Sequence, residues 1–418
     1  MADTEDEKRQ ETGVGPAPLS DHPGERTDNT NASYSGSAPT QAPYPPTAVD
    51  NGGSGWGVDT GRESVNPRHR QPIWQGESLF LNIPREIREI IIESVLHSCR
   101  EPPGSPDKIN RVDFHDMRYM AWRRKVEGIW NEQGSTHAPS NGLSLLLTSR
   151  QLSIETRSVI DRLKNAKSPD YVIEISVLNE TSLYPTWLSV PWLTNSIDTL
   201  HVDVRLFGSI LNRRDRRGLA GDGGRYGFHW SFLAVLERFL RYGPVGLKKR
   251  EDNSEESEDR GIFVRNLVLD FQSVETELTF PPDTIDYRQW KDVRINLSRS
   301  YERRYGTNPD ISDFKTKPEW LCAYLTSEIY GLLSLGFHHR PYGQILYERI
   351  GTMRFLLNGK LQGEVDLSSS LAMKTPDRLE FGTMFREERD IAYRKWLPDT
   401  IAQREKQGFS PVKLRDRQ

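Results

Sequence analysis

Strand-like and helical patterns alternate along the second half of the chain, and this alternation limits the fold more than any other feature. Residues 171–178 are rich in β-branched side chains, and residues 199–206 alternate apolar with polar ones, as β-strands do. An amphipathic helical pattern covers Phe228–Tyr242, and a further strand pattern covers 263–271. Strands separated by helices are typical of a sheet layered with helices. The sequence therefore predicts a mixed α/β (α+β) fold.

The same alternation continues toward the C-terminus. A helix is predicted over 319–337 and a strand over 352–357. That strand is expected to turn back at Asn358-Gly359 into a partner strand over 361–367, because Asn-Gly favours the tight turn of a β-hairpin. The intervals between the strand patterns are unequal, which argues against a regular leucine-rich or propeller repeat.

The first 72 residues have too little apolar surface to fold by themselves. They are rich in Gly, Pro, Ser, Thr, Asp and Asn, so burial cannot offset the entropy lost on ordering. We predict a disordered tail over 1–72, a helical segment over 73–167, an α/β region over 168–405 and a C-terminal tail over 406–418.

The predicted folded part opens with an amphipathic helix that begins near Leu79. Its apolar residues recur mostly at steps of three and four and share one face. They are Ile83, Ile87, Ile90, Ile91 and Val95. Asn82 is a candidate cap, Pro84 suits the first turn, and Glu86 complements the helix dipole. The pattern ends before residues 101–104, which are rich in Pro and Gly.

A second helical pattern covers 143–164, after a mostly polar insertion at about 100–141 that holds a possible short helix over 119–130. The apolar residues of the second pattern are Leu146, Leu147, Ile154, Val159, Ile160 and Leu163. We expect the two main helices to pack together.

The run Ile83-Pro84-Arg85-Glu86-Ile87-Arg88, with Ile91 and Val95 following at helical spacing, resembles the opening helix of an F-box. The later run Leu145-Leu146-Leu147-Thr148-Ser149-Arg150-Gln151-Leu152 resembles the closing helix of that domain. The combination is also similar to a large group of fungal F-box-like proteins of poorly characterised function, in which a longer α/β region usually follows.

This resemblance implies a protein–protein interaction module that docks on a Skp-type linker of a cullin ubiquitin ligase, while the C-terminal region selects an unknown substrate. The residues implied for partner binding are Ile83, Pro84, Glu86, Ile87, Ile91, Val95, Leu146 and Ser149. Two alternatives stay open: a structural or interaction protein with no ubiquitin link, and, more remotely, an enzyme of undetected type. The same aliphatic residues could also simply form the core of their own domain.

No catalytic, cofactor or metal site is expected, and we predict that the chain is not an enzyme. Cys99 and Cys322 are the only cysteines and lie far apart, which argues against a disulfide framework and a zinc module. The adjacent pair His338-His339 is poorly placed to share one metal ion. The glycine-rich residues 221–227 follow an arginine-rich run instead of a strand, unlike a dinucleotide-binding loop.

Charge and hydropathy bear on the class of partner and on where the protein is found. With 56 basic and 59 acidic residues the formal net charge is -3, which does not indicate nucleic acid or an anionic membrane as a partner. Charged runs at 212–227 and 248–260 are expected to be surface insertions. No stretch approaches the roughly 20 apolar residues of a membrane span. We therefore expect a cytoplasmic or nuclear protein.

The most unusual part of the C-terminal region is the stretch 185–192, which holds two tryptophans and two prolines. Paired rigid rings could form an aromatic surface for a peptide. Alternatively, the stretch plugs the edge of the sheet between the two neighbouring strands. We favour the plug, because the connection between those strands has to cross the core.

Overall fold

The computed structural model describes residues 79–106, 111–113, 118–119, 124–125, 128–132, 140–209, 228–244, 259–287, 289–290, 314–336, 339–375, 381 and 385–414. The chain divides into two units, Met1–Trp74 and Gln75–Gln418. All the described residues belong to the second unit, and the predicted tail over 1–72 lies outside them.

Among the described residues, the largest sheet has six strands in the order β10-β9-β8-β7-β5-β6. Their bounds are β5 Asp170–Leu178, β6 Ser182–Ser189, β7 Ser196–Phe207, β8 Phe263–Gln272, β9 Ile350–Leu357 and β10 Lys360–Asp366. The inner strands β5, β7, β8 and β9 run parallel, and the edge strands β6 and β10 run antiparallel to their neighbours. The predicted mixed α/β fold is confirmed.

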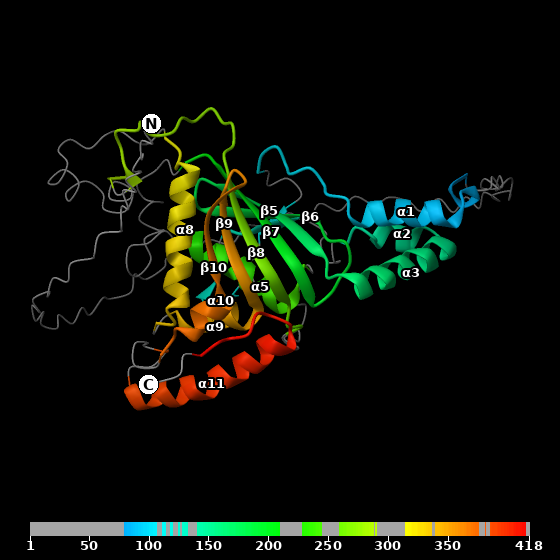
Figure 1. Ribbon diagram of the computed structural model, residues 1–418. Helices are drawn as coiled ribbons and strands as arrows, with labels where there is room; N and C mark the ends of the chain where they lie inside the picture. Colours follow the sequence, from blue (N-terminus) through cyan, green and yellow to red (C-terminus); the bar gives the residue numbers. More distant parts are fainter. Residues whose placement is uncertain are drawn as a thin grey trace, which may run out of the picture. The chain divides into compact units, whose positions relative to one another are not determined.

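Three helices cover one face of this sheet: α5 (Phe228–Tyr242), α8 (Pro318–Leu333) and α9 (Arg340–Arg349). Figure 1 shows α5 behind the strands. Along the chain the parallel strands cross the sheet in a single direction, from β5 to β7, β8 and β9. Because connections between parallel strands are right-handed, all the connecting helices fall on the same face.

The opposite face of the sheet carries polar side chains, among which His201 and Arg354 are exposed. The segment that follows the first long helix crosses part of this face. Its Arg100 backbone N–H donates to the Leu188 carbonyl oxygen at 2.9 Å, and the Arg205 guanidinium donates to the carbonyl oxygen of Pro103. The polar insertion of the sequence is thus partly built onto the sheet.

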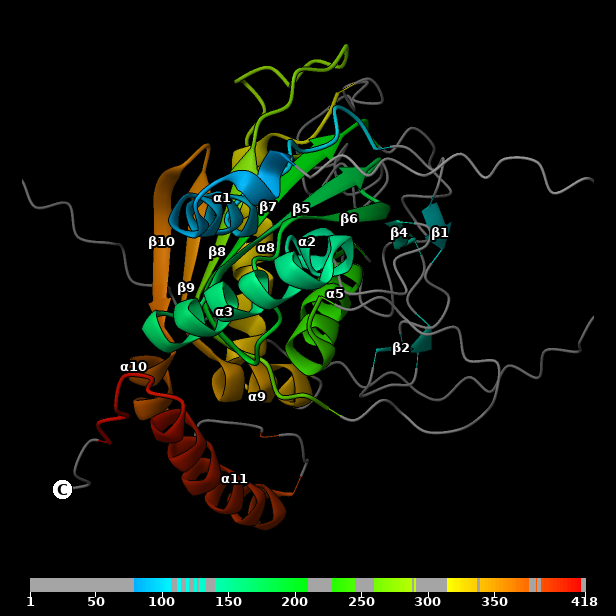
Figure 2. The ribbon, with the colours of Figure 1, turned by 90° about the vertical axis from the view of Figure 1, so that its right-hand side faces the viewer.

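The N-terminal helices form a core of their own. The 3-10 helix η1 (Leu79–Asn82) leads into α1 (Arg85–Leu96), which packs against α3 (Arg150–Ala166), and α3 also contacts α2 (Leu143–Thr148). Figure 2 shows these three α-helices together. The buried residues of this core are Ile92, Leu96, Leu152, Val159, Ile160 and Trp192. Trp192 follows β6, so the sheet region supplies one side chain to the helical core.

The helix predicted over 119–130 is wrong. The described residues of that region form short strands: β1 (Arg111–Asp113) pairs with β4 (Trp130–Glu132), and β2 (Arg118–Tyr119) pairs with β3 (Arg124–Lys125). Contacts with distant residues decide this. The Trp130 ring stacks on Tyr184 of β6, with 6.3 Å between ring centroids, and these partners cannot be read from a local pattern.

Three details of the predicted helices also differ. The helix predicted over 143–164 is two helices, because Ser149 has an extended backbone between α2 and α3. Asn82 does not cap α1; Pro84 holds the cap position and makes no side-chain hydrogen bond there. The helix predicted over 319–337 ends at Leu333, and Leu335 then takes a left-handed backbone, with φ of 57°.

The aromatic stretch 185–192 lies at the sheet edge. Its first part belongs to β6, where Pro185 pairs with Ile175 of β5. An edge strand tolerates proline, because one side of the strand makes no sheet hydrogen bonds. Trp187 is half-buried against the sheet core, and Trp192 is only 4% exposed in the helical core. Both rings are therefore packed within the chain.

Two further helices, α10 (Leu367–Ala372) and α11 (Arg386–Lys406), complete the described fold. In both views α11 lies beneath α9 and α10 (Figures 1 and 2). No helix among the described residues is long and apolar enough to cross a lipid bilayer.

Candidate protein interaction site

The structure leaves all the predicted partner-binding residues at least partly accessible. Pro84, Glu86 and Ile87 are exposed. The half-buried ones are Ile83, Ile91, Val95, Leu146 and Ser149. The helical core is thus completed mainly by other residues of the same helices.

Helix α1 has two apolar faces. Ile92 and Leu96 are fully buried against the helical core, whereas Ile87 is 46% and Ile90 61% exposed. At 3.6 residues per turn, Ile87 and Ile90 lie on the side of the helix opposite Ile92 and Leu96. We call the outward set, Ile83, Ile87, Ile90 and Ile91, the α1 stripe.

A buried ion pair orients α1. The Arg88 Nη2 donates to Glu155 Oε1 of α3 at 2.6 Å, and its Nε donates to Oε2 at 2.9 Å. The same guanidinium donates to the carbonyl oxygens of Leu81 and Ile83 in the turn that enters α1. One side chain therefore joins η1, α1 and α3, and the rotation of α1 that it favours turns the α1 stripe outward.

This ion pair predicts a pH dependence of stability. The hydrogen bond from Arg88 lowers the pKa of Glu155, so the folded state favours the carboxylate. A lowered pKa contributes stability that is present above the unfolded value, about 4.3, and is lost as the pH falls through the folded pKa. We expect the stability difference between the wild type and Glu155→Gln to be largest near pH 7 and to shrink below about pH 4.5.

Urea unfolding of both proteins between pH 3 and pH 7 measures that difference. Amide exchange in α1 and α3 shows whether the change in stability lies in these helices. The comparison with Glu155→Gln is needed because burial raises the pKa values of Glu174, Glu237 and Glu348, which act in the opposite direction. A difference that stays constant with pH contradicts the assignment.

A second group of exposed aliphatic residues lies on α2 and α3. Leu143 is 36%, Leu147 76% and Ile154 60% exposed. The sequence pattern counted Leu147 and Ile154 among the apolar residues of one continuous helix. The break at Ser149 changes the helical phase, so residues before and after it no longer share a face. The sequence did contain a signal for this break, because a Ser between two apolar helical runs is a candidate N-cap for the second run.

Ser149 has a structural role at this break. Its Oγ accepts a hydrogen bond from the Leu152 backbone N–H at 3.2 Å and caps α3. The neighbouring Leu146 is half-buried. Of the predicted site residues, those on α1 are therefore the ones that the fold presents most openly.

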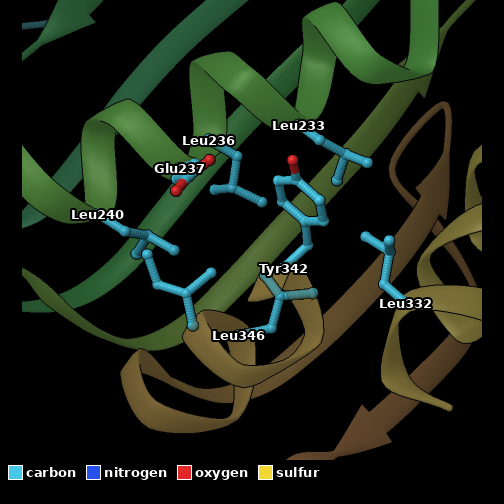
Figure 3. A pocket seen from close by; sticks show the side chains of 8 residues that line it. Leu233, Leu236, Glu237, Leu240, Leu332, Tyr342 and Leu346 are labelled. Atoms are coloured by element: carbon cyan, nitrogen blue, oxygen red, sulfur yellow. The ribbon is translucent and has the colours of Figure 1, made fainter. Parts of the chain in front are cut away.

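A further place where a ligand could lie, among the described residues, is a crevice between helices of the sheet region. Figure 3 shows a narrow crevice between α5, α8 and α9. It is lined by Leu233, Leu236, Glu237, Leu240, Leu332, Tyr342, Ile345 and Leu346. The Glu237 carboxylate accepts a hydrogen bond from Arg241 at 3.0 Å. The other lining residues are aliphatic except for Tyr342, so the crevice is largely apolar.

The residues considered for metal and phosphate binding are described only in part. Among the described residues, no three His, Cys, Asp or Glu side chains come together where a metal ion could be held. Both cysteines are free thiols, Cys99 exposed and Cys322 buried. His338 and the glycine-rich residues 221–227 lie outside the described residues.

Comparisons with known proteins add no relative: no family model, no curated protein and no solved structure matches the chain.

Proposed function

We propose that this chain is a protein–protein interaction module that offers the α1 stripe to a partner. Its role would be that of a substrate-recognition adaptor of a cullin-type ubiquitin ligase, acting in the cytosol or nucleus with a Skp-type linker as the partner. The observation that carries the proposal is the outward exposure of Ile87 and Ile90 on a helix whose other face already fills its own core.

Exposed aliphatic side chains in a row differ from scattered ones. A single exposed isoleucine is normal on a protein surface, but neighbours at helical spacing form a continuous apolar strip. Such a strip fits the groove of a partner, which reads side chains at steps of three and four. The F-box-like run around Ile83-Pro84 favours a linker protein as that partner. An interaction protein with no ubiquitin link is the second candidate, because the strip alone does not name its partner.

The test is calorimetric titration of the full chain with a purified Skp-type linker protein. Each buried isoleucine contributes about 1.5 to 3 kcal/mol, so Ile87→Asp with Ile90→Asp should weaken binding by at least about 100-fold. Because both side chains are exposed, the melting temperature should change little.

Two control variants separate binding from folding. Leu361→Asp makes the same kind of change at an aliphatic residue that is 59% exposed on β10, and it should bind as the wild type does. Ile92→Asp places a carboxylate in the helical core and should unfold α1. A wild-type chain that binds no linker contradicts the adaptor role, and equal binding by the double variant contradicts the α1 stripe as the site.

A further inference from the structure

We propose that α2 and α3 form a second docking surface, which takes an acidic amphipathic helix of a partner protein. The surface consists of Leu147, Arg150, Ile154 and Arg157, and we call it the α2–α3 surface. It goes beyond the function proposed above, because it lies on other helices than the α1 stripe and its arginines select an acidic partner.

Three of these residues lie together on α3 and face away from α1, and Leu147 stands near the end of α2, three residues before Arg150. Arg150, Ile154 and Arg157 recur at steps of four and three, so they share one face of α3. Leu152 and Glu155, which are buried toward α1, lie on the other face. Figure 1 shows α1 and α3 on opposite sides of the helical segment, with α1 above and α3 below. The α1 stripe and the α2–α3 surface therefore point in different directions.

The two surfaces differ in charge. Neither Arg150 nor Arg157 makes an ion pair with a described residue; the Arg157 guanidinium reaches only Ser153 Oγ, at 3.5 Å. Asp161, one turn beyond Arg157, is an acidic residue on this face, and exposed Lys164 follows it. The surface thus stays basic on balance.

By contrast, the residues beside the α1 stripe are mostly acidic. Glu86 is exposed, and Glu89 and Glu93 are half-buried one and two turns further along α1. Arg85 pairs with Glu89 at 2.8 Å, and Arg162 pairs with Glu93 at 2.9 Å. These ion pairs neutralise most of the charge beside the α1 stripe, whereas the arginines of the α2–α3 surface remain available to carboxylates of a partner.

The apolar residues decide the class of partner. Leu147 is 76% and Ile154 60% exposed, and Ile154 lies between Arg150 and Arg157 on one face of α3. Leucines flanked by glutamates on one face of a helix supply both an apolar contact and a charge partner. A nucleic acid would use the arginines but would leave Leu147 in water.

The experiment uses two labelled helical peptides of the same length that present leucines on one face and differ only in the flanking residue, Glu in one and Lys in the other. Fluorescence anisotropy with the full chain should show the Glu peptide binding at least about tenfold more tightly. Arg150→Glu with Arg157→Glu should reverse this preference, and Ile154→Asp should weaken both peptides. Ile87→Asp with Ile90→Asp should leave the Glu peptide bound as in the wild type.

Several results would overturn the proposal. One is equal affinity for the two peptides, and another is loss of the Glu peptide with the α1 variant alone. A third is a dimer in sedimentation that Ile154→Asp dissociates, since the occupant would then be a second copy. Binding to phosphatidylserine vesicles but not to the Glu peptide would assign the surface to a membrane.

The two proposals fail in different ways. If the linker protein does not bind but the chain still binds the Glu peptide more tightly than the Lys peptide, the adaptor role is contradicted and the α2–α3 surface is supported. If Arg150→Glu with Arg157→Glu abolishes linker binding, the two surfaces form a single site, and the separate partner proposed here is wrong.

Discussion

Replacing Arg404 by alanine should lower the free energy of unfolding by about 3 to 5 kcal/mol, because two buried carbonyl oxygens lose their donor and a cavity remains. Arg404 is fully buried on α11. Its Nη1 donates to the Ile350 carbonyl oxygen at 2.7 Å and to that of Tyr347, and its Nη2 donates to Ser368 Oγ at 2.8 Å. This side chain ties α11 to the end of α9, the start of β9 and α10.

Burial lowers the pKa of Arg404 to about 10, because the buried guanidinium loses its contact with water, and the side chain still carries its charge at neutral pH. Arg404→Lys keeps a charge but loses the planar fork, so we expect roughly half of the alanine effect. Urea unfolding measures both variants. Amide exchange should locate the loss in α11 and α9, and an alanine variant as stable as the wild type contradicts the anchoring role.

Replacing Trp192 by alanine should lower the free energy of unfolding by about 3 to 5 kcal/mol, and the loss should fall mainly on the helical core. The indole is 4% exposed among the buried residues of α1 and α3, and it meets the His97 ring edge-on at 5.8 Å between centroids. The Trp192 carbonyl oxygen accepts a hydrogen bond from the Tyr171 hydroxyl of β5 at 2.5 Å. Amides of α1 and α3 should therefore exchange faster, while those of β7 and β8 stay protected.

The matched control is Trp192→Phe. The indole N–H finds no hydrogen-bond acceptor among the described residues, so phenylalanine loses volume but no polar contact. We expect it to retain most of the stability that alanine loses. Similar losses for the two variants, or equal exchange changes in the sheet and in the helices, would contradict a local packing role.

The elements predicted correctly are those whose own side chains carry a strong period. Helix α5 begins and ends where its pattern does, and β5, β7, β8 and β9 differ from the predicted ranges by a few residues. Each of these elements is covered by other elements of the core, so many of its residues are apolar and its pattern is easy to recognise. Asn358 and Gly359 both take positive φ, 48° and 76°, as the predicted hairpin turn requires.

The elements that were missed are stabilised by contacts that leave little local pattern. Helix α11 is highly charged and buries few of its residues, among them Tyr393, Thr400 and Arg404, so it shows no wide apolar face. Strand β6, which contains Pro185 and Trp187, lacks the alternation of apolar and polar residues seen in an ordinary strand. Its pairing with β5 stabilises it. Neither partner is visible from the segment alone.

The candidate site was predicted only in part. The sequence identified Ile83, Ile87 and Ile91 as one face of a helix, and the structure leaves that face outward or half-buried. It gave no sign that Ile154 would be exposed, because that depends on the break at Ser149. Whether any of these residues binds a partner stays a prediction.

The sequence by itself determined the alternation of strands and helices, the mixed α/β class that follows from it, and the residues that share each helical face. Only the tertiary structure decided which of those faces is covered. Helix α1 is apolar on two sides, and the partners that choose between them, Glu155 of α3 and Trp192 after β6, are far away in the sequence. Periodicity reports which side chains point the same way, whereas burial depends on what packs against them, and that is a property of the whole chain.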